Sequence, residues 1–392
     1  MKPRLQPLDL LRGIVMVVMA LDHVRDFFHD GSQLFSPEDL TRTTPLLFFT
    51  RWITHFCAPV FVFLSGAGAY LSSRRGKSPA GLSRFLWTRG LWLLFVEMVI
   101  VAAAINFQWP FQLILWQVIW VFGWSMIALS VLIHVPWKPL LAGSLAVICL
   151  HNTLDGVKPE AFGSLAWLWQ ILHVPFGVFT LPGGIPAMIL YPLIPWVAVM
   201  SAGFVFGRVY DLEPDRRRRA LWLLGGVLTL TFVVLRFTNW YGDPSPWATQ
   251  SSPVMTLLSF LRATKYPPSL LYLLMTLGPA ILVLAALDRT EVSDANPFLA
   301  FGRVPMFYYL LHFNLIHALM AVLAWFRYGR MDFAFQLPKA VNPAAAGYPP
   351  DYGYSLAVTY LIWIGVVAAL YPLCRWFVEV KRRNRSPWLS YF

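Results

Sequence analysis

The chain has 392 residues, of which 58% are hydrophobic and 13% are charged, and its formal net charge at pH 7 is +12. Soluble domains carry about 25% charged residues, so this composition excludes a water-soluble globular protein and indicates an integral membrane protein. The basic residues stand in short segments between apolar stretches, which is the distribution that sets the topology of a membrane protein. We therefore expect no nucleic-acid partner, in spite of the positive net charge.

The apolar stretches predict an all-α fold, because a helix needs about 20 apolar residues to cross the hydrocarbon core. Ten spans are predicted, near residues 8–28, 52–71, 85–105, 112–133, 138–151, 186–208, 219–237, 268–287, 303–326 and 354–377. The Trp-rich segment 161–181 is an eleventh span, a re-entrant segment or an interfacial helix. We therefore expect a single domain over residues 1–392, a polytopic transmembrane bundle of 10 or 11 helices.

The basic residues also predict the orientation of the bundle. If the spans alternate, most of the 31 Lys and Arg residues lie on the same side as the N-terminus, which places both termini in the cytoplasm. The N-terminal apolar run lacks a signal-peptide cleavage site, so we expect it to be the first span. The three longest loops, 29–46, 238–267 and 327–353, then lie on the outer side, where they could roof a site.

The first span carries charged residues that packing alone does not require. An ionisable group costs roughly 2.5–3.5 kcal/mol at the centre of a membrane helix, so such groups mark functional sites. Arg12 and His23 are separated by about three helical turns, so they share one face about 16 Å apart along the axis. Asp9 is placed to pair with Arg12 at the cytoplasmic end.

Around His23 the sequence offers two carboxylates and an arginine. Asp26 is placed to orient the imidazole ring, and Asp22 is placed to pair with Arg25. An imidazole held by a carboxylate is a general-base arrangement. The alternative is that these residues only cap a helix that leaves the membrane, and the residues by themselves leave both interpretations open.

The second predicted span also carries polar residues at its outer end. Arg51 and His55 are four residues apart and share a helical face near the outer surface. Ser65, Gly66 and Gly68 allow another backbone or a thin ligand to approach closely. Simple helix packing is the better explanation of the two glycines.

The ninth span places His312, Asn314 and His317 within an otherwise apolar helix. A single buried histidine is more often structural, but three polar residues within six positions favour a functional site. Glu97 in the third span is a further candidate, with pairing to an arginine of the bundle as the alternative. The cysteines are far apart and no spacing predicts a metal site, so we expect no metal.

Three segments together resemble a known family. They are LDLLRGIVMVVMALDH at residues 8–23, FVFLSGAGAYL at 61–71 and FYYLLHFNLIH at 307–317. They are similar to the catalytic domain of the heparan-α-glucosaminide N-acetyltransferase family and its bacterial relatives. The Arg12 to His23 spacing also resembles the membrane acyltransferases that acetylate O-antigen and other surface glycans. Both belong to a broader transmembrane acyltransferase group.

The resemblance implies an acyl-CoA-dependent transmembrane acyltransferase in a bacterial cytoplasmic (inner) membrane. An acyl group, expected to be acetyl, passes from cytoplasmic acyl-CoA to a hydroxyl or amine of an acceptor on the outer face. The large lumenal domain of the animal enzyme has no counterpart here, so we expect an envelope glycan or small acceptor rather than heparan. The expected partners are acyl-CoA, that acceptor and the lipid bilayer, with a homodimer left open.

The same resemblance suggests roles for individual residues. The expected catalytic residues are His23, Asp22, His312 and His55, and the expected acyl-CoA-binding residues are Arg12, Arg84, Arg89 and Ser65. In the heparan-modifying enzymes the histidine assigned to catalysis follows the first helix, so His29 and His55 compete with His23 for that role. The catalytic histidine could act as a general base or could form an acyl-histidine intermediate, and the sequence does not distinguish these two mechanisms. A transporter with a His- and Arg-lined path is the alternative function, and a non-catalytic membrane scaffold is a third.

Overall fold

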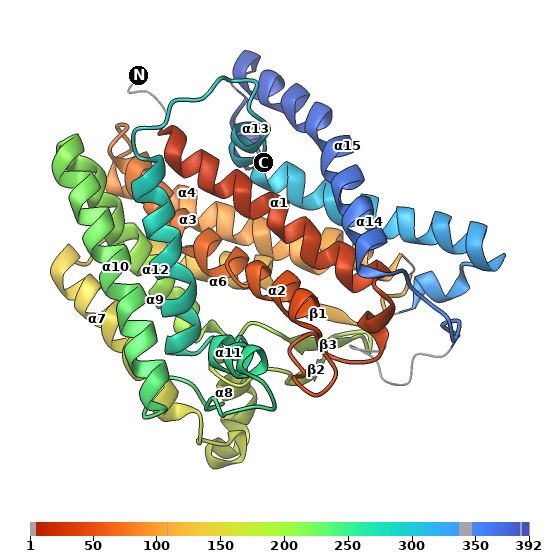
Figure 1. Cartoon of the computed structure of the whole chain (residues 1–392). Helices are drawn as coiled ribbons and strands as arrows, with labels where there is room; N and C mark the ends of the chain where they lie inside the picture. The colour runs from red at the N-terminus through yellow and green to blue at the C-terminus, as the bar shows by residue number, and fades with distance from the viewer. Residues whose placement is uncertain (1–4, 108, 337–346, 385, 392) are drawn as a thin grey trace.

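The computed structural model describes residues 5–107, 109–336, 347–384 and 386–391. The described chain is a helical bundle with a small sheet at one end (Figure 1). The helices are α1 (Gln6–Phe28), α2 (Pro45–Thr54), α3 (Cys57–Ser73), α4 (Pro79–Phe95), α5 (Ala102–Asn106), α6 (Val118–Leu132), α7 (Trp137–Leu150), α8 (Ala166–Leu172), α9 (Leu193–Phe206), α10 (Pro214–Thr238), α11 (Pro253–Leu261), α12 (Leu270–Leu287), α13 (Pro297–Arg303), α14 (Pro305–Tyr328) and α15 (Leu356–Arg383). The N and C ends lie at the same end of the bundle (Figure 1).

Within the described ranges, seven helices are long and apolar enough to cross a membrane. An eighth crossing results if the bent pair Trp137–Leu154 and Pro159–Leu172 counts as one span. Helix α1 has 23 residues, long enough to cross a membrane, but carries several charged side chains, and α6 is apolar but has only 15 residues. The predicted all-α, multi-pass transmembrane bundle is therefore confirmed, with fewer full-length spans than the ten expected.

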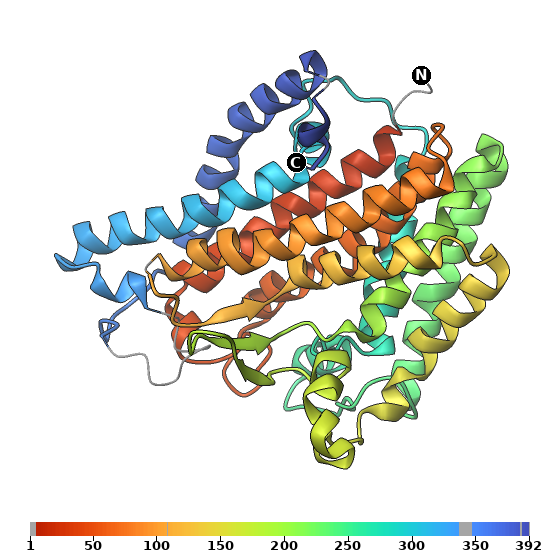
Figure 2. The same cartoon turned by 180° about the vertical axis from the view of Figure 1, so that it is seen from behind.

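Two predicted spans are shorter than expected because their first residues form strands. Strand β1 (Ile114–Trp116) precedes α6, and strand β3 (Pro186–Ile189) precedes α9. Strand β3 lies between β1 and β2 (Val178–Thr180), parallel to β1 and antiparallel to β2. Gly183 and Gly184 have positive φ angles of 88° and 78°, which close the turn between β2 and β3. Seen from behind, the sheet lies away from both termini (Figure 2).

The segment 161–181 does not cross the bundle as a helix of its own. Its only α-helix is α8, and the helical pair that includes α8 is bent by 110° at the break after α7. Residues 161–165 belong to a 3-10 helix (Pro159–Leu165), and the remainder of the segment forms β2 and its connections. Of the three alternatives that the sequence leaves open, a full additional span is therefore wrong.

Helix α1 is the central element of the bundle, and it contacts α2, α3 and α12 to α15. It begins with Pro7 in its first turn and ends at Phe28, beyond which His29 has an extended backbone. Its closest neighbour is α13. A Cβ atom on Gly13 would lie 1.7 Å from a backbone oxygen of α13, and one on Gly302 would lie 1.7 Å from a backbone oxygen of α1. Glycine at both positions therefore allows the two backbones to touch.

Helices α3 and α9 also approach each other closely because each has a glycine at the contact. A Cβ atom on Gly66 would lie 2.0 Å from the backbone oxygen of Met200, and one on Gly203 would lie 2.1 Å from that of Phe63. This supports the interpretation of Gly66 as a packing residue. Gly68 faces the guanidinium of Arg12, which a Cβ atom would approach to 3.0 Å.

Candidate functional site

A cavity of about 670 Å³ runs through the bundle. It is lined along α1 from Met16 to His29 and along α14 from Pro305 to Met320. At 1.5 Å per residue each of these stretches is about 20 Å long, which is most of the thickness of a bilayer's hydrocarbon core.

One end of the cavity, here called the Arg89 end, is lined by Ser65 and Arg89. The other, here called the loop end, is lined by residues 31–37, 265–266, 334, 336 and 348. Each of the three long loops therefore contributes to the roof, as the sequence predicts.

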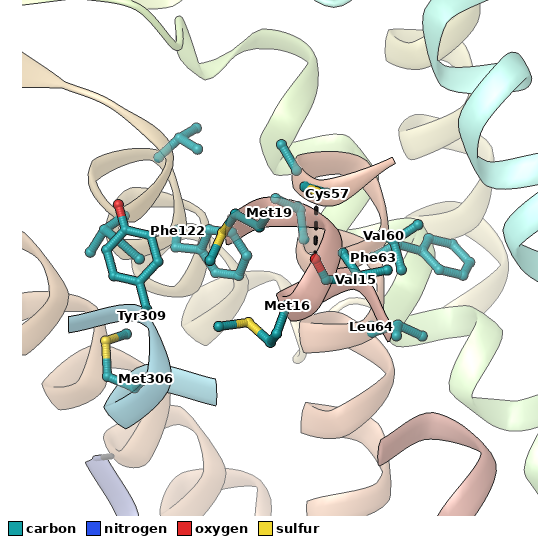
Figure 3. Close-up of a cluster of buried hydrophobic side chains, with 14 of the residues drawn as sticks. Val15, Met16, Met19, Cys57, Val60, Phe63, Leu64, Phe122, Met306 and Tyr309 are labelled. Atoms are coloured by element: carbon teal, nitrogen blue, oxygen red, sulfur yellow. Dashed lines mark hydrogen bonds between the residues drawn. The ribbon is translucent and has the colours of Figure 1, made fainter. Parts of the chain in front are cut away.

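The middle of the cavity is apolar. Met16 and Met19 of α1 extend towards Met306 and Tyr309 of α14 and Phe122 of α6 (Figure 3), and all five residues line the cavity. Flexible methionine side chains adapt to ligands of irregular shape. A slender, largely apolar group can therefore occupy this stretch.

His23 faces the cavity from α1, half-buried. Its ring packs against Phe313 at 4.7 Å and against His312 at 5.2 Å between centroids. Neither ring nitrogen makes a hydrogen bond to another residue in the part of the chain that the structure describes. The expected orienting contact from Asp26 is absent, because that carboxylate binds the guanidinium of Arg25 instead. Tilted and edge-on ring contacts with His312 and Phe313, rather than a carboxylate, hold the imidazole in place.

Asp22 lines the cavity beside His23, but its carboxylate is fully engaged by arginines. Arg51 Nη1 donates to both oxygens at 2.8 and 2.6 Å, and Arg25 Nη2 lies 2.9 Å from Oδ1. The predicted pairing of Asp22 with Arg25 is confirmed, and Arg51 joins α2 to α1 through the same carboxylate. A carboxylate neutralised by two guanidinium groups is a poor proton acceptor. Asp22 is therefore an anchor for the site and is unsuited to act as a base.

His55 is placed outside the cavity lining. It is 1% exposed, between α2 and α3, and its Nε2 lies 3.3 Å from Oε1 of Glu38. Burial alone would raise the pKa of Glu38, but the charges of His55, Arg51 and Lys265 outweigh it and lower the pKa of Glu38 to about 2. Glu38 thus ties the first long loop to the α2–α3 junction.

His29 lines the cavity but has no lone pair free for catalysis. Its Nδ1 accepts a hydrogen bond from the backbone N–H of Gly31 at 3.0 Å, so a neutral ring carries its proton on Nε2, which lies 3.5 Å from Oδ1 of Asp30. Burial lowers the pKa of His29, which favours this neutral form. His29 therefore terminates α1 and positions the first loop.

The polar residues of α14 separate into different roles. His312 is fully buried behind His23, its Nδ1 facing the Tyr309 carbonyl oxygen at 2.5 Å. His317 lines the cavity and joins α5 to the segment after α14, with its ring nitrogens 2.8 Å from the Ala104 oxygen and 2.6 Å from the Ala334 oxygen. Asn314 is exposed on the outside of the bundle and donates to its own helix.

Glu97 does not pair with an arginine among the described residues. It is fully buried in the π-helical stretch Val96–Val101 between α4 and α5. Its Oε1 accepts a hydrogen bond from the backbone N–H of Gln117 at 3.1 Å, at the start of α6. The carboxyl group is a buried cap on α6, where N–H groups lack partners within the helix.

The four residues expected to bind acyl-CoA fall into two pairs. Arg89 and Ser65 line the Arg89 end of the cavity. Arg12 does not line it, because its guanidinium binds Asp9 at 3.2 Å and donates to the Leu64 oxygen at 2.8 Å. Arg84 is exposed on α4, and it does not line the cavity either.

The sequence did not single out Lys265 and Tyr266 of the loop end, or Tyr191, which lines the cavity beside Lys265. These three residues lie in irregular segments before α12 and α9, so no helical periodicity could connect them with His23. Within the described ranges, no three His, Cys, Asp or Glu side chains are grouped so as to hold a metal ion.

Comparison with known families gives a match to the heparan-alpha-glucosaminide N-acetyltransferase catalytic domain over residues 4–235. The matched part contains His23, Asp22 and the Arg89 end of the cavity, and it leaves α12, α14 and Lys265 outside. A search of curated proteins found no match. Because the match covers more than half of the 392 residues, the chain belongs to the heparan-alpha-glucosaminide N-acetyltransferase catalytic-domain family, which makes it an acetyltransferase-like membrane enzyme.

Proposed function

We propose that this enzyme transfers an acetyl group from acetyl-CoA, held at the Arg89 end of the cavity, to a hydroxyl or amine of an acceptor that enters at the loop end. The observation that carries the proposal is the unpaired imidazole of His23 in the wall of a cavity that follows α1 and α14 for most of a membrane's thickness. The guanidinium of Arg89 is suited to the phosphates of CoA. The methionine-lined middle suits a thin pantetheine chain.

In the proposed reaction, the acceptor oxygen or nitrogen attacks the thioester carbonyl carbon while His23 takes the acceptor's proton. The bond between that carbon and the CoA sulfur then breaks, and the sulfur takes the proton from His23 and leaves as CoA thiol, which restores the neutral imidazole. The products are the acetylated acceptor and CoA. The imidazole lines the cavity and packs against Phe313 and His312, which restrain it where a general base is needed.

Several contacts support the predicted orientation, in which both termini and the Arg89 end are cytoplasmic. Arg74 pairs with Asp211 at 3.1 Å, which brings the α3–α4 and α9–α10 connections together. Arg217 pairs with Asp288 at 2.7 Å, which adds the segment after α12. All of these basic connections therefore gather at one end of the bundle, the distribution typical of a cytoplasmic face. We further propose a bacterial inner membrane as its location.

The decisive experiment measures transfer of labelled acetyl from acetyl-CoA by the purified protein in detergent, with a panel of amino sugars and hydroxyl acceptors. His23→Gln is expected to lower kcat by about 10²–10⁴-fold, because a positioned general base contributes that much. His29→Gln is the matched control, since it lines the same cavity and its Nδ1 is already occupied. Full activity of His23→Gln would remove His23 from the mechanism.

Donor binding is tested separately. Arg89→Gln is expected to raise KM for acetyl-CoA by about tenfold or more, the loss expected for one charged hydrogen bond. Arg84→Gln is the control, because Arg84 is exposed and away from the cavity. Uptake of acceptor into proteoliposomes without acetyl-CoA, together with no binding of acetyl-CoA, would favour a transporter instead.

A further inference from the structure

Lys265 is a buried cation at the loop end of the cavity. The residue is only 9% exposed, and it lines the cavity together with Tyr266 and Tyr191. Its Nζ lies 5.1 Å from the centre of the Tyr266 ring and 6.0 Å from that of Tyr191. Among the residues that the structure describes, Lys265 makes no hydrogen bond and no ion pair. The charge of Lys265 acts on the carboxylates of Asp22 and Glu38 at longer range, but its ammonium contacts neither. A buried ammonium without a direct anionic contact is typical of a site that a ligand completes.

The neighbouring carboxylates are already occupied by other cations. Both oxygens of Asp22 accept from Arg51. Glu38 lies against His55 at 3.3 Å and against Arg51 at 3.8 Å. The carboxylates of Asp22 and Glu38 are therefore bound by arginine and histidine side chains, and Lys265 lines the cavity without a direct contact to either.

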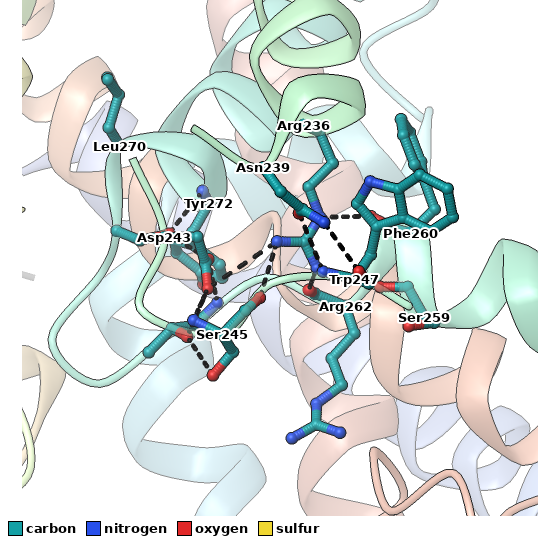
Figure 4. A network of polar contacts seen from close by, with 12 residues as sticks. Arg236, Asn239, Asp243, Ser245, Trp247, Ser259, Phe260, Arg262, Leu270 and Tyr272 are labelled. Carbon is teal, nitrogen blue, oxygen red and sulfur yellow. Dashed lines mark hydrogen bonds and ion pairs between the residues drawn. The ribbon is translucent and has the colours of Figure 1, made fainter. Parts of the chain in front are cut away.

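Lys265 is also held rigidly in place. The buried guanidinium of Arg236 donates to the backbone oxygens of Phe260, Ser245 and Ser259 at 2.9, 2.8 and 3.0 Å, and it also donates to that of Arg262 (Figure 4). One side chain at the end of α10 thus fixes α11 and the chain that follows it.

Asp243 fixes the turn that contains Lys265. Its Oδ2 accepts from the backbone N–H of Thr264 at 2.8 Å and from Oγ of Ser269 at 2.7 Å. The Ser269 N–H in turn donates to the Thr264 oxygen at 2.9 Å. Lys265 and Tyr266 lie between these two anchored residues, so their orientation towards the cavity is built into the fold. A rigid, desolvated cation beside two aromatic rings is a preorganised binding group.

We propose that Lys265 is a specificity-determining residue that binds an anionic group of the acceptor, a carboxylate, phosphate or sulfate, while Tyr266 and Tyr191 contact the acceptor beside that group. The preferred acceptors are therefore acidic sugars or sugar derivatives rather than neutral ones. This inference rests on the proposed function, because it assigns the loop end of the cavity to the acceptor.

The test combines binding with kinetics on the full-length protein in detergent. Binding of glucosamine, glucosamine 6-phosphate, glucosamine 6-sulfate and glucuronate is measured by calorimetry, and acetyl-CoA is measured in separate titrations. Lys265→Met is expected to weaken binding of the acidic probes by about 10- to 100-fold and to leave glucosamine almost unchanged, as expected for loss of a charged hydrogen bond. Lys265→Arg keeps the charge and should retain the preference. Lys158→Met, which removes an exposed lysine away from the cavity, is the matched control.

In turnover assays Lys265→Met should raise KM for the acidic acceptor that is used, with kcat little changed, because the interaction stabilises bound substrate and transition state equally. An equal fall in kcat for neutral and acidic acceptors would instead assign Lys265 to the reacting carbonyl oxygen and overturn the proposal. Equal binding of glucosamine and all acidic probes by the unmodified protein would overturn it as well. Failure to bind acetyl-CoA, with the acidic preference intact, would count against the proposed acetyl transfer and leave the assignment of Lys265 standing.

Discussion

Asp22 illustrates how a residue that looks catalytic can be structural. Its carboxylate joins Arg51 of α2 to Arg25 of α1 at the edge of the cavity. Removal of one partner from a buried ion pair costs about 3–5 kcal/mol, because the remaining charges lose their compensation. Asp22→Asn is therefore expected to lower the thermal unfolding midpoint in detergent substantially. Asp26→Asn is the control, because that side chain is 48% exposed and its loss should cost about 1 kcal/mol or less. Equal midpoints for the two variants would show that Asp22 does not anchor α2.

Glu38 makes the protein's stability depend on pH. Its pKa falls from an ordinary value of 4.5 to about 2, so the folded state favours the carboxylate. The contribution to stability is complete above pH 4.5, decreases as the pH falls towards 2 and is absent below it. Its full size is about 3 kcal/mol by linkage. Unfolding midpoints of Glu38→Gln and the unmodified protein should therefore differ at pH 6 and converge as the pH falls through this range. A difference that stays constant with pH would contradict this.

At the residue scale the sequence predicted local pairs and missed distant ones. Asp9 with Arg12 and Asp22 with Arg25 follow from helical spacing, and both are present. Arg51 was recognised as polar, but its partnership with Asp22 depends on how α2 lies against α1. The spacing of residues along one helix does not show which residues of another helix they contact.

At the element scale, the crossing of α3 and α9 depends on the absence of side chains at two positions. A Cβ atom on Gly66 would lie 2.0 Å from the Met200 oxygen, which belongs to a backbone that cannot rotate away. Gly66→Ala is expected to destabilise the protein by about 1–3 kcal/mol, the usual cost of overpacking. Gly226→Ala on α10 is the control, since a Cβ atom there meets nothing within 4 Å, and it should be neutral or stabilising by up to about 1 kcal/mol. Thermal unfolding in detergent measures both, and a neutral Gly66→Ala would mean that the helices can separate without cost.

Hydropathy located the helices well and their ends less well. The predicted spans 8–28, 219–237 and 268–287 match α1, α10 and α12 closely. The spans 112–133 and 186–208 began too early, because an apolar run of strand residues has the same hydropathy as a helix. Pairing of β1 with β3 joins segments about 70 residues apart, so it could not be inferred from either run by itself.

At the scale of the whole molecule, the cavity is composed of segments that the sequence could list but not assemble. Its long walls come from α1 and α14, which lie at opposite ends of the chain, and its roof comes from three loops. The sequence predicted that the loops share one face, because topology follows from counting spans. It could not predict that Lys265 enters the cavity, because that depends on the contacts that Arg236 and Asp243 make in the folded loop.

The orientation of the whole bundle is open to a direct test by cysteine labelling. Thr41 is exposed in the first long loop, at the loop end of the cavity, and Arg75 is exposed in the α3–α4 connection at the opposite end. In a Cys149→Ser background, which removes the exposed native thiol, an impermeant maleimide applied to intact cells should label Thr41→Cys and leave Arg75→Cys unlabelled. Both should react after permeabilisation, which controls for thiol reactivity.

The expected labelling follows from the excess of basic residues at the Arg75 end, since Lys and Arg in short loops are retained in the cytoplasm. The reverse labelling would place the Arg89 end outside, away from the cytoplasmic pool of acetyl-CoA, and would contradict the proposed direction of transfer.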